Sequence, residues 1–134
     1  MHNLPKEICD VIDDHDFLTY QKVADLIGST KQEMSYFHTN KQQFSFRKYL
    51  RLSFVVYPEN QKEVMDEWCL RFDSVESVKQ SFEYASITRN KELLKALIDK
   101  HTGDSSFTKH VAVYTVLYDY YMFKYEADEL VNKI

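Results

Sequence analysis

The side chains best suited to chemistry in this sequence are a set of polar groups spaced along residues 30–39. They carry the hydroxyl, amide or ammonium groups that bond to the base edges and phosphates of DNA: Thr30, Lys31, Gln32, Ser35, Tyr36 and Thr39. Gln32 can make a bidentate contact with adenine, whereas Lys31 can reach a guanine or a phosphate. Ser35 and Tyr36 can bond to phosphate oxygens. We therefore predict that this segment contacts DNA.

A helix must present these groups, and the surrounding residues predict a helix-turn-helix. Thr19 can cap a first helix, and Gly28 can end it because glycine tolerates a left-handed C-cap. Ala24 is the small residue expected where the two helices cross. Met34 and Phe37 follow as apolar anchors beneath the second helix, which leaves its polar residues outside.

The first helix is expected to turn a set of apolar residues toward the core: Val23, Ala24, Leu26 and Ile27. Ser29 or Thr30 is expected to cap the second helix. Any tight helical pair can place an alanine and a glycine in this way. A purely structural pair of helices therefore remains the alternative to DNA contact.

The charge of the chain is concentrated in one basic segment. Residues 18–52 hold six Lys or Arg against two acidic residues, although the whole chain has a net charge of −4. Residues 1–17 and 53–134 are each acidic overall. A local basic segment is what a phosphate backbone attracts. Within it, Arg47 and Lys48 are expected to hold the DNA backbone beside the second helix.

The composition predicts an all-α fold. Among 134 residues there are only two glycines and two prolines, too few for the many turns of a sandwich or barrel. Apolar residues recur at helical spacing along most of the chain. We predict a helix-turn-helix bundle over residues 1–57, followed over residues 58–134 by antiparallel helical hairpins of the tetratricopeptide-like kind.

Catalytic and cofactor-binding patterns are not found in the sequence. It has no glycine-rich phosphate loop and no HExxH, so we predict neither an enzyme nor a cofactor or metal site. Cys9 and Cys69 lie 60 positions apart without paired spacing, so both are predicted to be buried thiols in a reducing, cytoplasmic environment. No apolar run reaches the length of a membrane span.

A tyrosine-rich segment, VAVYTVLYDYYMFKYE, begins at Val111. An aromatic stripe of this kind usually belongs to a core. A helix that is apolar on most sides also needs a partner when it lies at the edge of a fold. We therefore predict a protein interface that includes Tyr118, Tyr121 and Phe123.

Several ordered pieces of the sequence resemble the N-terminal part of the arbitrium peptide receptors (AimR), lysis–lysogeny regulators of phages that infect Bacillus-type hosts. The pieces are the helix-turn-helix with Met34-Ser35-Tyr36-Phe37, Phe44 to Pro58, Met65 to Leu70, and Phe82-Glu83-Tyr84-Ala85. The resemblance covers about residue 18 to the end of the chain.

This resemblance implies a DNA-binding helix-turn-helix followed by tetratricopeptide-like helices, and so a phage or prophage transcription regulator. In the family the helical array continues, binds a short secreted peptide and dimerises at its far end. Those parts have no counterpart here, so a peptide ligand is not expected. The chain is either an excised piece or a short relative.

Its expected partners are double-stranded DNA and a second copy of itself in a weak homodimer. Alternatively, it regulates a phage repressor or a receptor without binding DNA.

Overall fold

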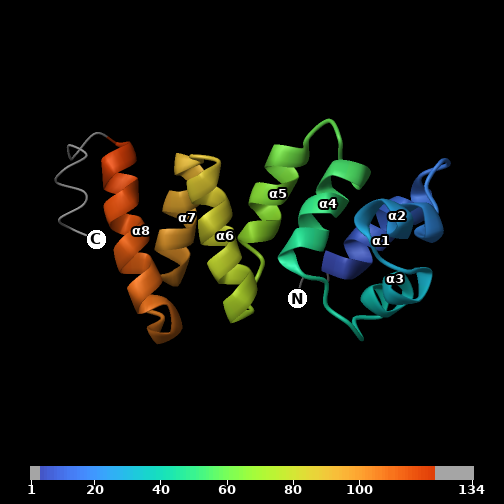
Figure 1. Cartoon of the computed structure of the whole chain (residues 1–134), viewed down its shortest axis with the longest axis horizontal. Coiled ribbons are helices and arrows are strands. Elements are labelled where there is room, and N and C mark those ends of the chain that lie inside the picture. Colours follow the sequence, from blue (N-terminus) through green and yellow to red (C-terminus); the bar gives the residue numbers. More distant parts are fainter. Residues whose placement is uncertain (1–3, 123–134) are drawn as a thin grey trace. The chain divides into compact units, whose positions relative to one another are not determined.

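The computed structural model describes residues 4–122, and all of its regular elements are helices (Figure 1). The elements are α1 (Leu4–Asp14), α2 (Tyr20–Ile27), α3 (Lys31–His38), α4 (Phe46–Val56), α5 (Gln61–Cys69), α6 (Val75–Ile87), α7 (Lys91–His101), the short 3-10 helix η1 (Ser105–Phe107) and α8 (Thr108–Tyr121). No strand occurs between residues 4 and 122. The predicted all-α class is therefore confirmed.

The chain divides into two compact units, Met1–Trp68 and Cys69–Ile134. Helix α5 belongs with the first unit because Trp68 packs edge-on against both Tyr49 and Tyr57, with ring centroids 5.9 Å apart in each case. The two regions predicted from the sequence, residues 1–57 and 58–134, meet one helix earlier in the chain than these two compact units do.

The core of the first unit forms where α1, α2 and α4 cover the inner side of α3. Phe37 is fully buried, stacks on Phe44 at 4.1 Å and meets the edge of Tyr49 at 5.6 Å. Val23 and Ile27 of α2 are also fully buried. These contacts hold α3 in place through its buried apolar side chains.

One residue of the predicted apolar face of α2 lies outside the core. Leu26 is 64% exposed, whereas Val23, Ala24 and Ile27 have no exposed surface. Successive residues of a helix are rotated by about 100°, so Leu26 lies well away from Ile27 and off the face that packs. The expectation that Leu26 faces the core was wrong for this geometric reason.

The second unit consists of helices that lie side by side and alternate in direction, α6, α7 and α8 (Figure 1). Short connections join them: Thr88 to Asn90 between α6 and α7, and a turn with η1 between α7 and α8. Its core comes from α6 and α7, with Phe82, Leu94 and Leu97 fully buried. Helix α8 packs on this pair without burying any residue completely.

Candidate nucleic-acid interface

The turn between α2 and α3 is built around Gly28. Its φ of +75° is the left-handed conformation that closes α2, and its N–H donates to the carbonyl of Ala24. A Cβ at this position would also lie 3.0 Å from the guanidinium of Arg51. The left-handed conformation favours glycine, as predicted from the sequence, and an added Cβ would also make the Arg51 side chain shift.

Helix α3 is fixed at its start by reciprocal capping and beneath by two apolar side chains. Thr30 accepts a bond from the Glu33 N–H, while the Glu33 carboxylate accepts one from the Thr30 N–H. Thr30, rather than Ser29, is therefore the N-cap. Met34 and Phe37 are fully buried, which confirms them as the anchors.

The outward side of α3 carries the residues predicted to contact DNA. We call these exposed residues the α3 polar face: Thr30, Lys31, Gln32, Ser35, Tyr36 and Thr39. The Gln32 amide donates to the Tyr36 hydroxyl at 2.7 Å, so these two side chains are held together along the helix. The Thr39 hydroxyl donates to the Ser35 carbonyl at 3.2 Å, which makes it a local C-terminal cap.

Lys48 lies against α3 instead of projecting freely into solvent. Its ammonium bonds to the Glu33 carboxylate at 3.0 Å and to the Ser29 hydroxyl at 3.5 Å, and it sits 5.1 Å from the ring centroid of Phe44. This ammonium holds the pKa of Glu33 below its usual value. Lys48 therefore braces the first turn of α3 against α4, and its expected phosphate contact stays a prediction.

Arg47 is exposed, and its expected contact with the DNA backbone stays a prediction. Arg51 lies one turn further along the same side of α4 as Arg47. Its guanidinium donates to the carbonyl of Ile27 at 3.0 Å, at the end of α2, while the residue as a whole remains exposed. Arg51 is one of the six cations of the basic segment, but it was not among the residues predicted to contact DNA.

A polar cluster ties α1 to the ends of α2 and α3. The Tyr20 hydroxyl lies 3.1 Å from Nδ1 of His38 and donates to the Asp13 carboxylate at 3.4 Å. Burial is the main cause that raises the pKa of Tyr20, so it stays a neutral phenol. His38 is thereby engaged at the inner edge of α3, where it orients the helix.

Both cysteines are buried free thiols, as predicted. Burial raises the pKa of the Cys9 thiol to about 11, so it stays protonated near neutral pH. Over the described range, residues 4–122, no group of three metal-ligating side chains comes together. Within that range no helix is both long and apolar enough to cross a membrane.

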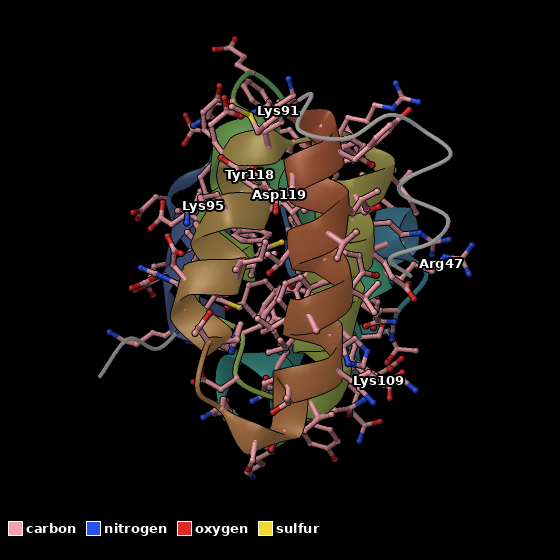
Figure 2. All side chains as sticks on the ribbon, turned by 90° about the vertical axis from the view of Figure 1, so that its left-hand side faces the viewer. Arg47, Lys91, Lys95, Lys109, Tyr118 and Asp119 are labelled. Atoms are coloured by element: carbon pink, nitrogen blue, oxygen red, sulfur yellow. The ribbon has the colours of Figure 1, made fainter. Side chains whose placement is uncertain are left out.

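The predicted protein interface lies on the second unit. The Tyr121 hydroxyl donates to the Ser86 carbonyl at 3.1 Å, so this tyrosine is turned toward α6. Figure 2 shows Tyr118 on the side of α8 nearest Lys95 of α7. Phe123 lies outside the described residues. The two tyrosines thus belong to the packed side of α8.

Together, α2, the Gly28 turn, α3 and the bracing α4 define a helix-turn-helix unit with a polar outward face. Comparisons with protein-family models, with curated proteins and with solved structures found no match.

Proposed function

We propose that this protein is a transcription regulator that binds double-stranded DNA through the α3 polar face. In this proposal it acts in phage or prophage lysis–lysogeny control, as the resemblance to arbitrium receptors implies, and works in the cytoplasm of a bacterial host. No catalytic step is involved.

The observation that carries the proposal is the division of α3 into two sides. Met34 and Phe37 fix the helix from beneath, while six polar residues point outward without being needed for the core. Thr30 and Thr39 also cap the helix, so Lys31, Gln32, Ser35 and Tyr36 are the residues of this face that are left for base edges and phosphates. Arg47 and Arg51 add positive charge beside the turn that begins α3.

The test is selection of fragments of the source genome by the purified chain at about 100–150 mM salt, where non-specific binding is weak. The decisive variant is Lys31→Ala with Arg47→Ala, which leaves the Lys48 brace intact. We expect one discrete site to be enriched by the wild type and lost in the variant.

The matched control removes two exposed lysines elsewhere, Lys6→Ala with Lys79→Ala. It changes the net charge by the same amount and should retain the enrichment. Circular dichroism checks that each variant is folded. Loss of enrichment in the control, or no enrichment by the folded wild type, would contradict DNA reading by α3.

A second candidate function is favoured by α8, in which none of the fourteen residues is buried. Here the chain would regulate a partner protein, a phage repressor or a receptor, without binding DNA. This candidate predicts that changes on α8 abolish regulation while the Lys31 and Arg47 substitutions have no effect.

A further inference from the structure

Two side chains of the α3 polar face are joined to each other, and their bond determines which groups of DNA each can still reach. The Gln32 amide donates one N–H to the Tyr36 hydroxyl at 2.7 Å. The two residues are four positions apart, so they are neighbours on one side of the helix. Both are exposed. The pair therefore lies on the surface that the proposed function turns toward DNA.

The bond to Tyr36 leaves the Gln32 amide with the groups that match adenine. A glutamine amide has two N–H donors and a carbonyl oxygen that accepts. Because one N–H goes to Tyr36, the second N–H and the carbonyl oxygen remain for a base edge. In the major groove adenine offers an acceptor at N7 beside a donor at N6, whereas guanine offers two acceptors and cytosine a donor. One donor beside one acceptor is the pattern that adenine complements.

The Tyr36 hydroxyl can bond to the DNA backbone at the same time. It accepts the bond from Gln32, so its own proton can be donated to another group. Phosphate oxygens are acceptors that tyrosine hydroxyls bond in protein–DNA complexes. The one hydroxyl can therefore join a phosphate to the amide that faces the base. A glutamine held in this way loses less side-chain entropy when it binds.

Helix α3 holds the backbone of both residues in place. At its start, Thr30 and Glu33 exchange hydrogen bonds across the turn that contains Gln32. At its end, the Tyr36 carbonyl accepts the Lys41 N–H at 2.8 Å, in the turn that closes the helix. Both side chains thus begin from fixed backbone positions, and their mutual bond restricts where the amide points.

A second glutamine pair, on α2, shows what this arrangement requires. The Gln21 amide donates to the Asp25 carboxylate at 2.8 Å, again between exposed residues four positions apart. An ionised carboxylate has no proton to donate to a phosphate, and its negative charge repels one. Of the two pairs, only Gln32 with Tyr36 can hold an amide beside the DNA backbone.

We propose that Tyr36 positions the Gln32 amide to read an adenine, so that the pair selects an A·T base pair at one position of the DNA site. Gln32 contacts the base, and Tyr36 acts through Gln32 while it bonds to a phosphate. This inference rests on the proposed function, DNA binding by the α3 polar face. It adds the base that the helix selects and the residue that positions the contact.

Selection from a library of random duplexes, with sequencing of the fraction bound by the full chain, tests this proposal. The wild type should enrich a motif with a fixed adenine at one position. Gln32→Ala should lower the preference at that position alone, by about fivefold or more. Gln32→Glu should change the preference to cytosine, whose amino group donates to a carboxylate. Tyr36→Phe keeps the ring but removes the hydroxyl, so it should relax the same position and no other.

Gln21→Ala is the matched control, because it removes the glutamine of the other pair and should leave the motif unchanged. The slope of log affinity against log salt is the second readout. It should be the same in Tyr36→Phe as in the wild type, because no charge is lost. A changed slope, or a preference relaxed at every position, would show that Tyr36 supports the whole interface and would overturn its positioning role.

The two proposals fail in different ways. A motif that Gln32→Ala and Tyr36→Phe leave unchanged would overturn the reading of adenine by this pair, while DNA binding by the chain would stand. A folded wild type that enriches no motif would contradict the proposed function, and this inference with it.

Discussion

Helices α3 and α8 each pack on other helices of their own unit, yet the chain positions them in different ways. Helix α3 has a capping box, two fully buried anchors and a lysine brace from α4. Helix α8 has no side-chain cap and no buried residue. Helix α3 is therefore fixed by local contacts at its start and beneath it, whereas α8 is held only by partly buried contacts with α6 and α7.

The largest expected difference between the two regions lies in their core contacts. Phe37→Ala should lower the free energy of unfolding of the first unit by about 3–5 kcal/mol, since it empties a fully buried site between Phe44 and Tyr49. Tyr114→Ala should cost the second unit only about 1–2 kcal/mol, because its ring is half-buried. Urea denaturation followed by circular dichroism measures both. Equal losses would contradict the view that α8 is held more loosely.

The Gly28 turn provides the next largest effect. Gly28→Ala should destabilise the first unit by about 1–2 kcal/mol, because alanine is disfavoured at positive φ and its Cβ would press on Arg51. Gly103 has a φ of +90°, and an added Cβ there would meet nothing within 4 Å. The loss of stability in Gly103→Ala would therefore come from the backbone conformation alone. Thermal denaturation of both variants isolates the contribution of the Arg51 contact. A larger loss for Gly103→Ala would show that this contact has no role.

Two neighbouring cations of α4 should respond in opposite ways. Lys48→Met removes the bond to Glu33, so it should lower the thermal midpoint slightly and leave the salt dependence of DNA binding unchanged. Arg47→Met should leave the midpoint unchanged and reduce the slope of log affinity against log salt by about 0.9, the effect of one lost phosphate contact. The same response from both variants would mean that Lys48 also contacts DNA.

The smallest expected effect is a pH dependence confined to the second unit. His101 is buried between Phe82 and Phe107, and its Nε2 has no hydrogen-bond partner among residues 4–122. Burial, aided by Lys100 and opposed by Asp104 and Asp73, lowers the pKa of His101 below 6.5. The unfolded chain then binds the proton more readily, so the stability present above pH 6.5 is lost as the pH falls below it.

The midpoint of unfolding of the second unit should therefore decrease from pH 7 to pH 5. A His101→Gln variant should show a smaller decrease, because glutamine does not titrate. Melting curves recorded by circular dichroism at each pH provide the comparison. An equal decrease in both proteins would assign the effect to other groups.

The local features of the fold could be predicted from the sequence because they depend on neighbouring residues. Thr19 and Gly28 bound α2 as expected, and Met34 and Phe37 anchor α3, since caps and helical periodicity act over three or four positions. The exposure of Leu26 shows the limit of this reasoning. An apolar side chain within a helix does not reveal which neighbours the helix meets.

The roles of the cations could not be predicted in the same way. Lys48 is 15 positions from Glu33, and Arg51 is 24 positions from Ile27, so both contacts exist only after α4 packs against the turn. A basic residue near a predicted DNA-binding helix has the same sequence signature whether it braces the helix or faces DNA. Likewise, Tyr121 bonds to Ser86, 35 positions away, a contact that the periodicity of α8 alone does not reveal.

Binding of DNA by the α3 polar face can be measured as the salt dependence of affinity for a fluorescent duplex. Anisotropy titrations would compare the wild type, Lys31→Ala with Arg47→Ala, and the control Lys6→Ala with Lys79→Ala. We expect the first pair of substitutions to lower the slope of log affinity against log salt by about 1.8, while the control pair retains the wild-type slope. Equal slopes for all three proteins, or no binding by the folded wild type, would contradict DNA binding by this face.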